Sequence, residues 1–154
     1  MAQYTQPDEW RSAWRRVLRG RKRLDGHFPD SEEYDDALYH FFQDAWHLKD
    51  WLKNDPSIGR TLTGLEDELR KHQSLMIAAD MANGTKHRLL TTIRAGANIT
   101  EKHHIIQVGN PKPVLQVRLL KLNDGSQHKD SDVADQAIAA WRAVFTTLGL
   151  APNA

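Results

Sequence analysis

Apolar residues recur at intervals of three and four along most of the chain, which is the spacing of helices that bury one face. Pro56 cannot continue the second of these segments, so that helix should end just before it. We expect the third to begin at Thr63 and to run on through Gly84, because a glycine inside a helix costs only about 1 kcal/mol. The segments together predict helices over residues 8–22, 31–53, 63–93 and 131–148.

Before the last helix the pattern changes to short, partly alternating apolar runs. These runs predict strands over residues 102–108 and 113–122, and an Asn-Asp-Gly turn after them suits a short third strand near 126–129. The predicted fold class is therefore α+β and mainly α. It is a single domain over residues 1–154, a bundle of about four helices with a small antiparallel hairpin or three-stranded sheet inserted before the last helix.

Composition removes several kinds of chemistry. The 154 residues include no cysteine, which excludes a disulfide scaffold, an iron–sulfur cluster, a cysteine zinc site and a thiol nucleophile. Lys and Arg number 21 against 20 Asp and Glu, so the chain as a whole is not a basic nucleic-acid coat. We find no apolar run near 18 residues and no apolar leader, and we therefore expect a cytoplasmic protein with no membrane segment.

Seven cations lie within thirteen residues of the first predicted helix, between Arg11 and Arg23. A basic stripe of this kind can neutralise phosphates, and we name Arg15 and Arg19 as phosphate-binding candidates. The alternative is a solvated face that pairs with nearby carboxylates. Those carboxylates are Asp30, Glu32, Glu33, Asp35 and Asp36.

A line of polar and aromatic side chains borders the apolar stripe of the second helix. At 100° per residue, His40, Asp44, His47 and Trp51 stack along one side. We expect these groups to be half-buried, and half-buried histidines beside carboxylates are the material of acid–base sites. The alternative is a pair of boundary histidines with purely structural partners.

The third helix carries a second polar group. If it continues past glycine 84, the side chains of His72, Asp80, Asn83 and His87 fall within a wedge of about 80°. Lys86 lies beside them. Helix formation alone does not require so many ligand-binding side chains on one face, so we consider them a candidate site. The alternative is that Asn83 and the glycine after it simply end a helix.

Two segments carry a resemblance to a known family. The motif Phe-Phe-x-x-x-Trp-His-Leu-x-Asp-Trp spans residues 41–51, and Asp-x-x-Asn-Gly-x-Lys-His spans residues 80–87. Together with the strand, Asp-Gly turn and tryptophan-containing helix that follow, they resemble a family of uncharacterised bacterial proteins over most of residues 31–148. That resemblance implies no particular chemistry.

More distantly, the chain resembles the HEPN (higher eukaryotes and prokaryotes nucleotide-binding) superfamily of helical, often dimeric domains, many of them ribonucleases of toxin or defence systems. Asp80 stands where the HEPN signature has an arginine before its histidine. The resemblance implies binding of RNA or a nucleotide, or a ribonuclease in bacterial stress or defence, and a homodimer. In a catalytic version, His87 is the general acid or base with help from His47. Asp80 then orients a histidine, and Asn83 and Lys86 hold the phosphate.

Two other functions stay open, as does whether the protein is an enzyme. One is a divalent-metal site between facing helices, with zinc, manganese or iron held by side chains of the second and third helices. The other is a non-enzymatic interaction module, because five tryptophans could exceed what one small core accommodates. Both the catalytic and the metal hypothesis require the second and third helices to share one site. The metal ligands would be His47, Asp50, Asp80 and His87.

Overall fold

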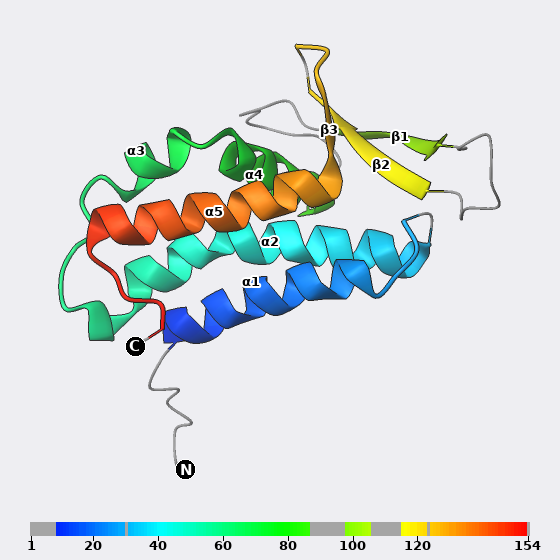
Figure 1. Cartoon of the computed structure of the whole chain (residues 1–154). Helices are drawn as coiled ribbons and strands as arrows, with labels where there is room; N and C mark the ends of the chain where they lie inside the picture. The colour runs from blue at the N-terminus through cyan, green and yellow to red at the C-terminus, as the bar shows by residue number, and fades with distance from the viewer. Residues whose placement is uncertain (1–8, 30, 87–97, 106–114, 123, 154) are drawn as a thin grey trace.

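Five α-helices and a three-stranded sheet make up the part of the chain that the structure describes (Figure 1). The computed structural model describes residues 9–29, 31–86, 98–105, 115–122 and 124–153. The first long helix runs antiparallel to the second and to the last, and a 3-10 turn, η1 (Pro56–Ile58), follows the second. The helices are α1 (Glu9–Asp25), α2 (Glu32–Asn54), α3 (Leu65–Arg70), α4 (Gln73–Lys86) and α5 (Asp130–Leu148).

Aromatic side chains from the two ends of the chain form the centre of the core. The rings of Trp10 and Trp14 on α1 lie 5.3 and 5.1 Å from the ring of Phe145 on α5, and Trp141 stacks on Phe145 at 5.7 Å. The indole N–H of Trp141 donates a hydrogen bond of 2.8 Å to the backbone carbonyl of Ala45 on α2, so its one polar atom is satisfied inside the core. The apolar stripes predicted for these helices therefore meet in one core.

Helices α1 and α2 pack closely along their length. They come close at Gly20, where an added Cβ would lie 3.5 Å from the Phe41 ring, an ordinary van der Waals distance. The predicted first helix ended at residue 22, whereas α1 continues past Gly20 to Asp25. At the other end of the pair, Asp55 accepts hydrogen bonds from the backbone N–H groups of Trp10 (2.9 Å) and Ser57 (2.8 Å). One carboxylate thus caps both the start of α1 and the start of η1.

The long helix predicted over residues 63–93 is wrong in one respect, because it is broken between α3 and α4. Leu65 and Leu69 bury one side of α3, and an unbroken helix would next bury Gln73, which is exposed. Ending α3 at Arg70 and restarting at Gln73 turns Leu75 into the core instead. The helix also begins later than predicted, because Gly64, not Thr63, directly precedes α3 as its N-cap residue, with φ +83°.

Helix α4 lies inside the bundle. Every described residue from Ser74 to Ala82 except Met76 is buried, which is the behaviour of a helix enclosed on all sides by its neighbours. It contacts α2, α3 and α5. The helix continues through the Asn83-Gly84 pair to Lys86, as predicted, and the rest of the expected helix, residues 87–93, lies outside the described residues.

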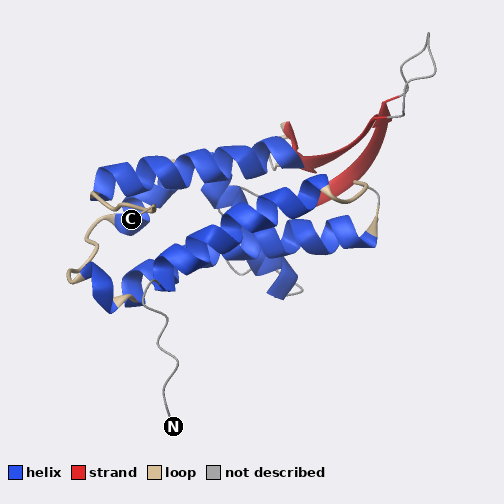
Figure 2. Ribbon diagram, turned by 60° about the horizontal axis from the view of Figure 1, so that its bottom comes forward, coloured by secondary structure: helices blue, strands red, loops and turns tan. Residues whose placement is uncertain are grey.

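The sheet projects from one end of the bundle, beside the start of α5 (Figure 2). Its antiparallel strands have the order β1 (Asn98–Ile105), β2 (Leu115–Lys121) and β3 (Gln127–Lys129), with a register shift between residues 99 and 101 of β1. The third strand and the turn before it confirm the prediction. Leu120 of β2 is fully buried and anchors the sheet to the helices.

The fold class predicted from the sequence, mainly α with a small antiparallel sheet before the last helix, is confirmed.

A hydrogen bond between two buried side chains joins α2 to the end of α5 that lies beside the sheet. Asp130 at the start of α5 is 1% exposed and accepts a hydrogen bond of 2.9 Å from the hydroxyl of Tyr34. None of the helices in the described part of the chain has the length and apolarity needed to cross a membrane.

Candidate nucleic-acid interface

The outward face of α1 carries four exposed cations in one stripe. Arg15, Arg19, Lys22 and Arg23 follow one another at intervals of four, three and one, so they share a sector of about 100° on the helix. None of the four forms an ion pair within the described part of the chain. We call this set the α1 stripe.

The other cations of α1 have carboxylate or carbonyl partners. Arg21 lies 2.6 Å from Asp135 on α5 and 2.8 Å from Asp25, and its hydrogen bond to Asp135 is the main reason that its pKa is raised. Arg16 donates to Asp44 on α2 at 2.9 Å. Arg11 donates to a backbone carbonyl near the C-terminus. The basic run is therefore divided into a paired set that joins helices and the α1 stripe.

In the described part of the chain, carboxylates outside the acidic cluster of α2 pair with the basic run. We expected Glu32, Glu33, Asp35 and Asp36 to neutralise it if it were only a solvated face. The described contacts place Asp25, Asp44 and Asp135 in that role, and Asp30 lies outside the described residues. Glu32, Glu33 and Asp35 instead occupy the first turn of α2, where negative charge stabilises the helix dipole.

An open hollow of about 400 Å³ lies on α2, near the end of that helix. Among the described residues, its lining comes from His47, Asp50, Trp51 and Asn54. These positions are separated by three, one and three residues, so they share one helical face. Two of the four, His47 and Trp51, belong to the polar line predicted for this helix.

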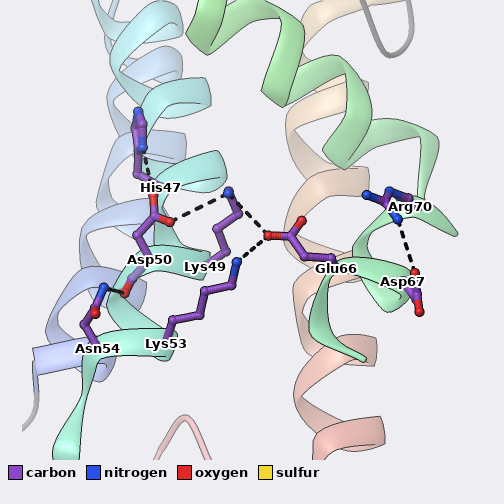
Figure 3. A network of polar contacts seen from close by, with 8 residues as sticks. All are labelled: His47, Lys49, Asp50, Lys53, Asn54, Glu66, Asp67 and Arg70. Carbon is purple, nitrogen blue, oxygen red and sulfur yellow. Dashed lines mark hydrogen bonds and ion pairs between the residues drawn. The ribbon is translucent and has the colours of Figure 1, made fainter. Parts of the chain in front are cut away.

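His47 and Asp50 are in contact within the hollow. The Nδ1 atom of His47 lies 3.3 Å from Oδ2 of Asp50, so a ring protonated at Nδ1 donates a hydrogen bond to the carboxylate (Figure 3). That tautomer leaves Nε2 as the proton acceptor. The side chain of Asn54 donates to the backbone carbonyl of Asp50 at 2.8 Å and holds the end of the helix in place.

A network of charges on the neighbouring side of α2 joins it to α3. Lys49 and Lys53 both reach Glu66, and Lys49 also lies 3.6 Å from Asp50 (Figure 3). The hydrogen bond from Lys53 is the main reason that the pKa of Glu66 lies below its ordinary value. All of these groups have partners, so we assign this network to the packing of α3 on α2.

The polar line of α2 is less buried than its pattern suggested. His40 and His47 are exposed, with half of the His47 side chain accessible, whereas Asp44 is 23% accessible and Trp51 is 37% exposed. Asp44 is partly covered because α1 packs on that side of the line and Arg16 contacts its carboxylate. The contacts that the line does make are therefore with α1 and within α2 itself.

The second polar group predicted from the sequence lies on α4 and just before it. Asp80 is 1% exposed, Asn83 is half-buried, and His72 precedes α4 instead of lying within it. His87 lies outside the described residues, as does the side chain of Lys86. No three histidine, aspartate or glutamate side chains gather into a metal-binding cluster in the described ranges. Both the catalytic and the metal hypothesis use His87, so the shared site that they require stays a prediction.

The tryptophans give little support to an interaction surface built from several indoles. Trp10, Trp14, Trp46 and Trp141 are at most 5% exposed and belong to the core, so Trp51 alone remains accessible. The guanidinium carbon of Arg16 lies 5.7 Å from the centre of the Trp51 ring.

Sequence reasoning did not identify the roles of Arg16 and Asn54 at this site. Arg16 was one cation among seven, and only the tertiary packing of α1 on α2 separates it from the α1 stripe. The prediction that this helix ends before Pro56 gave Asn54 no role, although its spacing of three from Trp51 and seven from His47 was the available signal. Comparisons of the chain with protein-family models, with curated proteins and with solved structures found no match.

Proposed function

We propose that this protein binds single-stranded RNA through the α1 stripe. The observation that carries the proposal is that four exposed cations lie on one helical face with no ion pair among the described residues, in a chain whose net charge is only +1. Seven of the chain's 21 Lys and Arg residues lie between Arg11 and Arg23, so its positive charge is concentrated there. A polyanion with regular spacing is the natural ligand of such a stripe.

The dimensions of the stripe suit a short stretch of nucleic-acid backbone. Arg15 and Arg23 are eight residues apart, which corresponds to about 12 Å along a helix. Phosphates on one strand follow one another at about 3.4 Å along a duplex axis, so the stripe can meet three or four of them. Contacts of this kind fix the strand on the protein and do not read its sequence.

The buried side of α1 argues against a lipid surface as the ligand. Helices that bind membranes in the plane of the interface insert an apolar face among the lipids. The apolar face of α1, with Trp10, Trp14 and Val17, is at most 2% exposed and is occupied by the core. The helix therefore offers charge alone to a partner.

A charge-reversal experiment tests the proposal. We expect a fluorescent ten-nucleotide RNA to bind the protein at low salt, with log affinity falling linearly with log salt at a slope between about −2 and −3 for three or four contacts. Replacing Arg15 and Arg19 together with glutamate should flatten the slope by about 1.4, because two contacts are lost. The binding should weaken alike for all sequences.

The matched control reverses two exposed cations elsewhere, Arg142 on α5 and Lys121 on β2. That variant has the same net charge as R15E/R19E, so it should keep most of the affinity if the stripe is the site. Both variants should retain the wild-type melting temperature, because exposed charges without partners contribute within about 0.5 kcal/mol. Absence of binding at low salt, or equal losses in the two variants, contradicts the proposal.

A second candidate function, cleavage of the bound RNA, is favoured by one observation: the contact between His47 and Asp50. Asp50 would hold the ring so that Nε2 of His47 accepts a proton as a general base. Incubating the protein with the same RNA measures this directly. In that case H47A should lose cleavage but still bind RNA through the α1 stripe, whereas intact RNA after long incubation with wild type leaves binding as the function.

A further inference from the structure

The hollow on α2 is contacted from α1 by Arg16 and differs from the α1 stripe in charge. Asp50 lines the hollow, and Asp44 lies beside it in contact with Arg16. Two carboxylates repel phosphate, so the hollow is a poor place for the backbone of a nucleic acid. The accessible indole of Trp51 offers instead a flat apolar surface with polar neighbours on both sides.

Arg16 connects the hollow to the stripe. Its guanidinium reaches over the Trp51 ring and holds Asp44, so the orientation of the indole is fixed from α1. On α1, Arg19 and Arg23 follow Arg16 at three and seven residues and therefore lie along the same edge of the helix. The indole is thus placed at the border of the stripe.

We propose that the hollow binds a nucleobase, stacked on the indole of Trp51, from a strand whose phosphates lie along the α1 stripe. This inference rests on the proposed function: the α1 stripe contacts the phosphates of the strand, and the hollow holds one of its bases. A base is uncharged and presents a π-face, and aromatic platforms beside a basic groove hold single strands in this way. Stacking tolerates any base, so the hollow should show little sequence preference.

Binding of oligouridine by W51A is the first test. Loss of one stacking platform should weaken the binding of a ten-nucleotide RNA by about 5- to 140-fold. The slope of log affinity against log salt should stay unchanged, because no phosphate contact is removed. W51F, which keeps an aromatic ring, should recover most of the loss and guards against a folding defect in the alanine variant.

The matched control is F28A. Phe28 is the other exposed large apolar residue in the described part of the chain, at 79% exposure, and lies in the turn before α2. Trp51 is 19 residues along α2 from its start, about 28 Å away. F28A should bind like wild type, and an equal loss in F28A and W51A would overturn the inference.

An abasic oligonucleotide separates the base from the backbone. A strand of equal length whose sugars carry no bases should bind wild type as weakly as ordinary RNA binds W51A, and W51A should lose nothing further on it. If W51A binds RNA like wild type while R15E/R19E loses affinity, the inference fails and the proposed function stands. If wild type binds neither strand, both fail.

Free nucleotides distinguish the remaining source of a base. Uridine monophosphate alone should bind far more weakly than the strand, because it lacks the contacts along α1. Binding of the monophosphate as tightly as the strand, unaffected by R15E/R19E, would make the hollow a nucleotide site and would overturn the placement of the strand.

Discussion

Replacing Asp55 with alanine should cost about 3 kcal/mol of the free energy of unfolding. Its carboxylate accepts one hydrogen bond from the Trp10 backbone at the start of α1 and one from Ser57 at the start of η1, and the residue is 7% exposed. Hydrogen bonds to charged groups contribute about 1.5–3 kcal/mol each, and the lower value applies because water can reach the vacated site. D55N keeps one carbonyl oxygen, so it should lose about half as much.

The same carboxylate makes the stability depend on pH. Burial would raise the pKa of Asp55, but hydrogen bonds from Ser57 and from the Trp10 backbone, with the charge of Arg11, outweigh burial and hold the pKa below its ordinary value. An aspartate whose folded pKa is depressed stabilises fully above its unfolded pKa of about 3.9. That stabilisation is lost as the pH falls through the folded pKa. The gap between wild type and D55N should therefore be constant from pH 5 to 7 and shrink below pH 4.

Urea unfolding followed by tryptophan fluorescence measures both effects, with midpoints shifting and the slope m unchanged. The control is D124A. Asp124 accepts a hydrogen bond of 2.8 Å from the backbone N–H of Ser126, the same turn geometry as Asp55 and Ser57, but it is exposed and caps no second helix. D124A should therefore lose much less. Equal losses in D55A and D124A, or a gap that ignores pH, would refute the reasoning.

Two further substitutions test the packing of α2 against its neighbours. G20A should raise the melting temperature by about 1–4 °C, because alanine favours the helix by about 0.5–1 kcal/mol and its Cβ would meet the Phe41 ring at an ordinary 3.5 Å; a lower melting temperature in calorimetry contradicts this. Y34F should destabilise the protein by about 1.5–3 kcal/mol, because the buried Asp130 carboxylate loses a hydrogen bond of 2.9 Å. An unchanged urea midpoint for Y34F would show that Asp130 does not depend on this hydroxyl.

The sequence predicted those features that depend on spacing within one segment. The stripe that contains Leu38, Phe41 and Leu48 predicted α2, and these residues are fully buried. The Asp-Gly turn predicted the third strand, because Gly125 adopts the positive φ that such a turn requires. The break before Gln73 was missed because Leu65, Leu69 and Leu75 were counted as one stripe, although Leu75 lies out of phase with the first two.

Features that join distant segments could not be predicted in the same way. Pro56 predicted only that a helix ends near Asp55, and nothing near Asp55 in the sequence indicates that it caps a helix 45 residues earlier. The division of the basic run likewise depends on which cations face α2 and α5. For the candidate site, spacing gave the shared face of His47 and Trp51, whereas their exposure depends on where α1 packs.

The contact between α1 and α5 has a consequence for how the chain is made. The aromatic face of α1 is completed by Phe145, which follows Trp10 by 135 residues. At 5–20 residues per second, a ribosome needs about 7–27 seconds to supply the missing partner. During that interval the indoles of α1 lack part of their cover, so nascent chains that stop before α5 should be prone to aggregation and dependent on chaperones.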